Sequence, residues 1–285
     1  YEVALPMTSY TRDIYVRRIK IYRAQLQSFL KDEVLDEALV AEVNLLLETL
    51  QTICSHPGLL DEDPSQNEDH EIQARWAENI STKFIFLAEL LELLASTDNH
   101  VIIVARPGQI LAELESLLIY HAIEYSRADI ERRTSTGRFR VTLCSTGAQQ
   151  YTVDPASIVI AFDPSHRELP FIDQLRVHPS FPDILVPLVS LVVTNSVEHI
   201  ERCFDTNIEA PGRLIKIASC MRQLMGRVGT FDEDGYDDPP SAANKIANYL
   251  SNDPRESSWP LLPMPDIHGL DLSLLSSQNF LEEQP

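Results

Sequence analysis

The sequence predicts an α/β fold in which helices cover both faces of a parallel sheet. Short apolar runs rich in β-branched residues alternate with amphipathic segments between residues 81 and 193. These runs are apolar at consecutive positions, so both faces of each strand should be buried, as in sheets with crossover helices on both sides. The predicted strands are 100–105, 122–125, 140–144, 157–162 and 185–193.

Helices are predicted before, between and after these strands. Residues 8–30 contain no Pro or Gly and carry apolar residues at helical spacing, which predicts one long helix. A second helix over 35–54 should stop before His56-Pro57-Gly58. The polar, acidic stretch 61–71 is typical of a linker or exposed loop. Further helices are expected at 83–94, 109–121, 196–204 and 213–227.

The chain divides into three expected parts: a helical extension with an acidic loop over 1–80, the α/β domain over 81–227, and an acidic, proline-rich C-terminal segment over 228–285. Residues 231–240 are acidic and rich in turn formers. We expect the end of the chain to pack back on the body, because its apolar residues are too many for a free tail: Trp259, Leu261, Leu262, Ile267 and Leu270. Since the chain begins at Tyr1, without Met or a leader pattern, we also expect it to be a fragment of a longer protein.

Composition limits the kinds of function. The 285 residues are 44% hydrophobic, enough for a sizeable core, and no apolar run approaches the roughly 20 residues of a membrane-spanning helix, so no membrane partner is predicted. A net charge of -20 opposes nucleic-acid binding by the molecule as a whole, although it leaves room for local basic patches. Four cysteines lack CxxC or His/Cys spacing, which predicts buried free thiols, no metal and a reducing compartment: Cys54, Cys144, Cys203 and Cys220.

Three passages resemble the second motor lobe of Swi/Snf-type chromatin remodelling ATPases. The first is a helix ending in Cys54-Ser-His-Pro57, and the second is the segment 81–91 with the strand 101–105. The third is Cys144-Ser-Thr-Gly-Ala148, followed by an apolar strand ending in Asp163. Their order and spacing agree with the family from residue 1 to about residue 204, so the resemblance implies a RecA-like lobe.

The departures from that family concern the nucleotide site. Its glycine-rich loop is replaced by Gln149-Gln150-Tyr151, where close approach of the backbone to phosphate needs glycine. Arg176 matches the first of two family arginines, but Pro179 stands at the position of the second. An arginine finger contributes about 10³- to 10⁵-fold in rate. No phosphate-binding G-x-x-x-x-G-K-[ST] loop occurs either, so we expect a pseudo-ATPase that is not an enzyme and holds no cofactor.

The opening residues 1–12 and the closing Trp259-Pro-Leu-Leu-Pro263 make the chain similar to fungal class II histone deacetylase complex subunits 2 and 3. That resemblance implies a helicase-like DNA-binding domain followed by a coiled coil that recruits the deacetylase. It also implies nonspecific binding of double- or single-stranded DNA, a class II deacetylase and a sister subunit as partners, a nuclear location and a role in transcription repression.

Four basic residues in the first predicted helix are candidates for contacts with DNA. At 100° per residue, Arg12, Lys20 and Arg23 fall within about 80° of one another and form a basic stripe, and Arg17 belongs to the same predicted helix. The alternative is a solvated face balanced by acidic residues of the second helix.

Two further groups are candidates for DNA contacts. Arg132, Arg133 and Arg138 belong to a predicted loop between strands, although they could instead pair with carboxylates of this acidic protein.

Ser145 and Thr146 follow a strand on the side where open α/β sheets bind ligands, and Arg106 ends another strand there. The two hydroxyls could equally bond local backbone. Asp163 is expected to be a turn residue.

The leading hypothesis is a non-catalytic, nonspecific DNA-binding module that tethers a deacetylase complex to chromatin. The alternative is a protein-docking scaffold of the same complex without DNA affinity. A residual ATPase is the third hypothesis.

Overall fold

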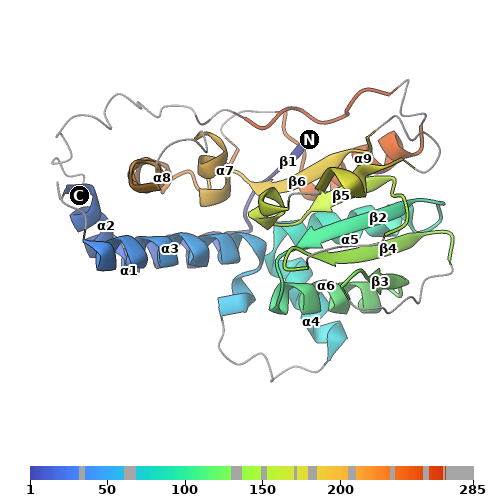
Figure 1. The fold of residues 1–285 in the computed structure, drawn as a ribbon, viewed down its shortest axis with the longest axis horizontal. Coiled ribbons are helices and arrows are strands. Elements are labelled where there is room, and N and C mark those ends of the chain that lie inside the picture. Colours follow the sequence, from blue (N-terminus) through green and yellow to red (C-terminus); the bar gives the residue numbers. More distant parts are fainter. Residues whose placement is uncertain are drawn as a thin grey trace.

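A parallel sheet forms the centre of the computed structural model, which describes residues 1–31, 36–60, 69–129, 137–148, 153–169, 172–178, 185–204, 210–231, 235–252, 257–265 and 267. Among these residues, six strands form one sheet in the order β1-β6-β5-β2-β4-β3, and every neighbouring pair is parallel (Figure 1). The strands are β1 (Glu2–Leu5), β2 (His100–Ala105), β3 (Tyr125–Arg127), β4 (Arg140–Ser145), β5 (Ile158–Ala161) and β6 (Leu188–Val193). The predicted parallel α/β fold is confirmed.

Side chains alternate across the sheet, so each strand contributes to two cores. Val101 and Ile103 of β2 join the larger core, whereas Ile102 and Val104 join a smaller one on the opposite face. The larger core lies under α4 (His70–Ile80), α5 (Thr82–Leu94), α6 (Gln109–Tyr120) and α9 (Pro239–Leu250). Two short 3-10 helices, η3 (Pro164–Glu168) and η4 (Ile172–Arg176), help to close the smaller core. They contribute Leu169, which directly follows η3, and Leu175 of η4.

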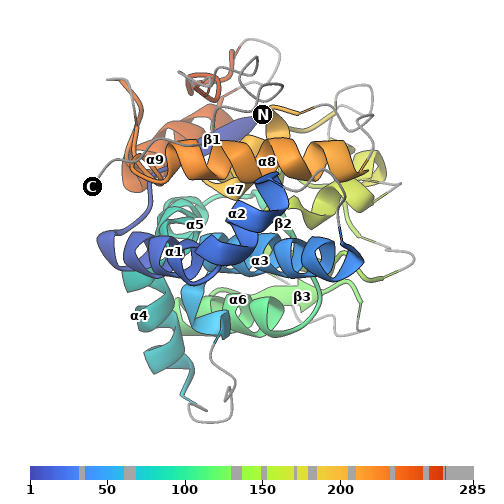
Figure 2. The ribbon, with the colours of Figure 1, turned by 90° about the vertical axis from the view of Figure 1, so that its left-hand side faces the viewer.

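A separate group of helices, here called the helical lobe, packs at the carboxyl end of the strands (Figure 1). It consists of α1 (Ser9–Ile21), α2 (Arg23–Lys31), α3 (Glu37–Ser55), α7 (Val197–Arg202) and α8 (Ala210–Leu224). Seen from that side, α1, α2, α3 and α8 lie in front of the sheet (Figure 2). The lobe has its own core, which includes Tyr15, Phe29, Leu46 and Ile217.

Helix α3 is long and apolar, although charged and polar residues interrupt its apolar runs. By length and hydropathy alone, it is the one helix in the described ranges that could cross a membrane. Its apolar residues Val43, Leu46, Leu50 and Ile53 are buried in the core of the helical lobe. The hydropathy of α3 therefore reflects packing against its neighbours.

The first strand and the described part of the C-terminal segment, 257–265 and 267, lie against the body. Strand β1 pairs with β6 in register from Glu2 opposite Ser190 to Leu5 opposite Val193. The ring of Trp259 stacks on that of Tyr1, with centroids 4.2 Å apart. Trp259 and Leu261 pack against the larger core, and Ile267 packs against the helical lobe. The expected docking of the C-terminal segment is confirmed for these residues, whereas Leu262 is 50% exposed and Leu270 lies outside the described residues.

Several predicted elements were wrong in their limits. The single helix over 8–30 is two helices with a break at Tyr22, because Leu26 and Phe29 of α2 turn into the helical-lobe core. Helix α4 begins at His70, inside the predicted 61–71 loop, of which 61–68 lie outside the described residues. Strand β3 starts three residues later than predicted, and β1 and α9 were not predicted. Cys203 is exposed rather than buried, while the other three cysteines are buried.

Candidate functional site at the carboxyl end of the sheet

Parallel strands bring Arg106, Asp163 and the Ser145-Thr146 pair to one edge of the sheet, where open α/β sheets bind ligands. Asp163 is 1% exposed and follows β5. Its carboxylate accepts the backbone N–H of Arg106 at 2.8 Å and that of Ser165 at 2.9 Å, and it also accepts the Ser165 hydroxyl. The contact with Ser165 caps η3, so the turn role predicted for Asp163 is confirmed.

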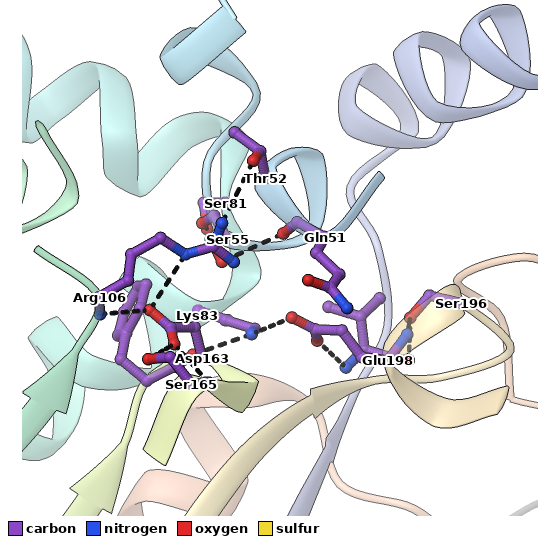
Figure 3. Close-up of polar contacts among 12 residues, drawn as sticks. Gln51, Thr52, Ser55, Ser81, Lys83, Arg106, Asp163, Ser165, Ser196 and Glu198 are labelled. Carbon is purple, nitrogen blue, oxygen red and sulfur yellow. Dashed lines mark hydrogen bonds and ion pairs between the residues drawn. The ribbon is translucent and has the colours of Figure 1, made fainter. Parts of the chain in front are cut away.

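The Arg106 side chain links the sheet to helix α3 (Figure 3). Its Nε lies 3.5 Å from Oδ2 of Asp163, and its Nη1 lies 3.5 Å from Oγ1 of Thr52 on α3. The guanidinium is therefore engaged within the protein, although 29% of the side chain remains exposed. Its contribution to a DNA surface stays a prediction.

Next to these groups, Lys83 and Glu198 form a buried ion pair (Figure 3). Lys83 Nζ of α5 donates to Glu198 Oε1 at 2.7 Å and to the Phe162 carbonyl at 2.9 Å. Oε2 of Glu198 accepts the backbone N–H of Val193 at 3.2 Å, at the end of β6. No sequence pattern predicted this pair. Its only signal was a single lysine near the start of an apolar helix.

Polar groups also fill the space between α3 and α7. Gln51 Nε2 donates to both carboxylate oxygens of Glu201, at 3.0 and 2.9 Å. Burial raises the pKa of Glu201, and the positive charges of Arg213 and Arg167 oppose that rise. Burial also lowers the pKa of Arg167, against the attraction of Glu201 and Glu198. The polar side chains at this edge are thus bound mainly to one another.

The hydroxyls of Ser145 and Thr146 make local contacts. Ser145 is 4% exposed, and its Oγ accepts the backbone N–H of Gly147 at 3.4 Å. Thr146 Oγ1 donates to the Ser165 hydroxyl at 3.2 Å. These contacts favour the local-turn interpretation over direct exposure to phosphate.

The motif positions that departed from the Swi/Snf pattern are described only in part. Gln149, Gln150, Tyr151 and Pro179 lie outside the described residues. Arg176 is described, and its side chain donates to the Val186 carbonyl at 3.0 Å and to Asp173 at 2.9 Å. These bonds join the end of η4 to Val186, just before β6.

Of the proposed loop arginines, the structure describes Arg138, and this residue lies away from Ser145 and Thr146. Arg138 is 88% exposed, lies just before β4, and has Nε 3.8 Å from Oδ1 of Asp98. Because Arg138 precedes β4 and Ser145 ends it, the whole strand separates them, which is about 16 Å at 3.3 Å per residue. Arg132 and Arg133 lie outside the described residues. Their contact with DNA stays a prediction.

The basic stripe of the first helices is placed on the helical lobe. Arg12 is half-buried and donates to the Gly226 carbonyl at 2.6 Å, which ties α1 to the end of α8. Arg17, Lys20 and Arg23 are exposed. Within the described ranges these three form no ion pair, so the carboxylates of α3 do not neutralise them by direct contact.

Helix α8 adds basic residues to the helical lobe that were not among the predicted DNA contacts. Residues 210–231 contain no acidic residue, in a chain that has 43. They carry Arg213, Lys216, Arg222 and Arg227. This absence of acidic residues was the signal that could have identified α8 as part of the surface.

Known proteins share both the sequence pattern and the fold. The family model of class II histone deacetylase complex subunits 2 and 3 matches residues 1–250. HDA1 complex subunit 3 of Saccharomyces cerevisiae is 26% identical over 253 residues, which are 80% of this chain and 38% of the relative. The chain spans 38% to 44% of the length of the curated relatives it matches.

Two solved structures extend the comparison. One, from structural and functional studies of the yeast class II Hda1 HDAC complex, has a TM-score of 0.76 at 20% identity and covers 93% of this chain and 92% of that one. The Sulfolobus solfataricus SWI2/SNF2 ATPase C-terminal domain has a TM-score of 0.53 at 14% identity, over 81% and 98% of the two chains. The fold is therefore that of a Swi2/Snf2 motor lobe. With the family match over residues 1–250, this shows that the chain belongs to the class II histone deacetylase complex subunits 2 and 3.

Proposed function

We propose that this chain is a non-catalytic, nonspecific DNA-binding module that tethers a class II histone deacetylase complex to chromatin in the nucleus. The observation that carries the proposal is the separation of charge. Residues 9–31 and 210–231, which form α1, α2 and α8, hold 10 of the 23 basic residues and only one of the 43 acidic residues, Asp13. The helical-lobe core brings these two segments together.

This separation matters because binding to DNA depends on local cations. A molecule of net charge -20 repels a phosphate backbone unless its basic residues are gathered on one surface. Arg17, Lys20 and Arg23 are exposed on that surface. Contacts of this kind fix no base sequence, which agrees with nonspecific binding.

The carboxyl-end site supports a non-catalytic role. Its polar side chains bind each other: Lys83 binds Glu198, and Arg106 binds Asp163 and Thr52. Arg106 and Asp163 are thereby held in contacts within the fold, and Pro179 occupies the sequence position of the second motor arginine. The family's description as complex subunits agrees with a role in assembly, with a deacetylase and a sister subunit as proposed partners.

Fluorescence anisotropy with labelled duplex and single-stranded DNA tests the proposal. We expect binding at low salt, with log K falling by about 0.9 per phosphate contact for each tenfold rise in salt. The variant Arg17→Gln/Lys20→Gln/Arg23→Gln should weaken binding and reduce that slope. The control Arg75→Gln/Lys245→Gln removes two cations that lie near carboxylates and belong to no candidate DNA surface, and it should leave binding nearly unchanged. Absence of DNA binding by the unmodified chain at low salt would reject the proposal.

The alternative is a docking scaffold without DNA affinity. It predicts that neither variant changes DNA affinity, because the unmodified chain itself does not bind DNA. Charge reversal at Arg132, Arg133 and Arg138 tests the loop independently. If that change abolishes binding while the α1–α2 variant does not, the DNA surface belongs to the loop before β4 instead.

A further inference from the structure

The helical lobe carries a groove between α2 and α8, with the end of α1 at one side. Figure 2 shows how these three helices are arranged. Its volume is about 420 Å³. The described lining consists of Ile19, Lys20, Arg23, Leu26, Gln27, Leu30, Arg222 and Met225. No Asp or Glu belongs to it, although the chain as a whole is strongly acidic.

The groove has an apolar floor. Ile19 and Leu26 are buried in the helical-lobe core, and Leu30 and Met225 pack against that core while remaining partly exposed. A phosphate backbone gains little from contact with these apolar side chains, because it binds through cations and hydrogen-bond donors. Apolar surface of this kind is instead covered by apolar side chains of a ligand.

Cations form the rim. Lys20 and Arg23 lie on one side and Arg222 on the other, all three exposed, and they line the same groove as the apolar residues. Their long side chains can keep the charged groups in water while the methylene stems cover apolar surface. A ligand that matches this groove therefore carries carboxylates along the borders of an apolar face.

The walls favour a helical ligand. Two helices, α2 and α8, flank the groove, so a third helix can lay its side chains between them as helices do in bundles. Grooves of this kind take amphipathic helices whose apolar residues recur at i, i+3, i+4 and i+7. Met225 is suited to such a floor because its flexible thioether adapts to different side chains.

We propose that the groove between α2 and α8 binds an acidic amphipathic helix of a partner protein. The apolar side chains of that helix would cover Leu26, Leu30 and Met225, and its carboxylates would meet Lys20, Arg23 and Arg222. This docking site does not depend on DNA binding. It shares two cations with the proposed DNA surface, so the two ligands compete for the helical lobe.

A synthetic helical peptide tests the groove with the whole chain. The probe carries leucines along one face and glutamates beside them, and its controls are a scrambled peptide and one with lysine in place of glutamate. We expect micromolar binding of the acidic helix, measured by fluorescence anisotropy, and much weaker binding of both controls. Equal binding of the three peptides, or none, would overturn the proposal.

Two variants separate this site from the DNA surface. Leu30→Asn/Met225→Asn removes apolar floor without changing charge and should weaken the acidic peptide by about tenfold or more. The same variant should leave DNA affinity unchanged, whereas Lys20→Gln/Arg23→Gln weakens both ligands. Circular dichroism and the thermal midpoint verify that each variant is folded, and Arg75→Gln on α4 serves as the remote control.

The outcomes distinguish the two proposals. If the unmodified chain binds the peptide but not DNA, the docking site stands and the DNA function falls. If Leu30→Asn/Met225→Asn weakens DNA as much as the peptide, the floor belongs to the DNA surface and the docking proposal is overturned. A folded floor variant that keeps full peptide affinity would also overturn it.

Discussion

Lys83 and Glu198 form an ion pair of 2.7 Å whose side chains are 0% and 1% exposed. The pair joins α5 to α7 at the carboxyl end of the sheet, between the sheet body and the helical lobe. Lys83→Met leaves the Glu198 carboxylate buried without its cation, and the expected loss is about 3–5 kcal/mol in the free energy of unfolding. Urea unfolding followed by circular dichroism measures it.

Restoring neutrality provides the control for Lys83. In Lys83→Met/Glu198→Gln the buried charge is removed, while the side chain at 198 can still accept the Val193 N–H. The double variant should therefore be more stable than Lys83→Met alone. A double variant that is as unstable as the single one, or less stable, would show that the penalty does not come from an uncompensated charge.

The burial of His56 should make the stability of the protein depend on pH. His56 is 2% exposed, its ring nitrogens have no hydrogen-bond partner among the described residues, and burial lowers its pKa from 6.5 to about 4. The folded state thus binds this proton more weakly than the unfolded state. The contribution of neutral His56 is fully present above pH 6.5 and is lost as the pH falls toward 4, by about 2 kcal/mol between pH 6.5 and 5.

Comparison with His56→Leu isolates this effect. The difference in unfolding free energy between the unmodified chain and the variant should shift by about 2 kcal/mol, in favour of the variant, from pH 6.5 to 5. Some pH dependence will persist in the variant, because burial also lowers the pKa of His100 and His166. Parallel stability curves for the two proteins over this range would contradict the prediction.

Local sequence predicted the elements whose pattern is strong. The strand 100–105 and the helices α5 and α6 were located to within a residue or so, because long apolar periodicity dominates there. Strand β1 is only four residues long, and its strand state depends on pairing with β6 far along the chain. The break at Tyr22 has no Pro or Gly and depends on the packing of Phe29 in the helical-lobe core.

The order of the strands predicted which residues lie at the candidate site, but it did not predict their side-chain contacts. Parallel strands place Arg106, Ser145 and Asp163 at one edge, and the sequence order of the strands is enough to expect this. The contact of Arg106 with Thr52 could not be predicted, because the position of α3 is set by the helical-lobe core. The joint surface of α2 and α8 required the same tertiary information.

Gly229 is a position where a side chain should be poorly tolerated. Its φ is +69°, and a Cβ there would lie 2.4 Å from the Cβ of Met7. Its N–H donates to the Thr194 carbonyl and its carbonyl accepts the Met7 N–H, both at 2.9 Å, so the backbone cannot move away freely. Gly229→Ala should cost at least about 1–2 kcal/mol from the left-handed backbone alone, plus the cost of the contact.

Gly226 is the matched control for that substitution. A Cβ at Gly226 would meet no atom within 4 Å, and the residue lies in the same turn after α8. Gly226→Ala should change the unfolding free energy by no more than about 0.5 kcal/mol. Thermal unfolding of both variants compares them directly, and equal midpoints would rule out the proposed clash with Met7.

A buried hydrogen bond from Val197 to Tyr15 connects α7 to α1. The Tyr15 side chain is fully buried on α1, and its hydroxyl oxygen accepts the backbone N–H of Val197, at the start of α7, at 2.8 Å. Tyr15→Phe preserves the ring but leaves that buried N–H without an acceptor, which should cost about 1–3 kcal/mol. Because the N–H belongs to the first turn of α7, its amide hydrogen exchange should accelerate more than exchange in β2.

Tyr22→Phe, at a half-buried position, is the control and should leave both stability and exchange nearly unchanged. Equal exchange at Val197 in the unmodified chain and Tyr15→Phe would mean that this hydrogen bond does not hold α7 against α1.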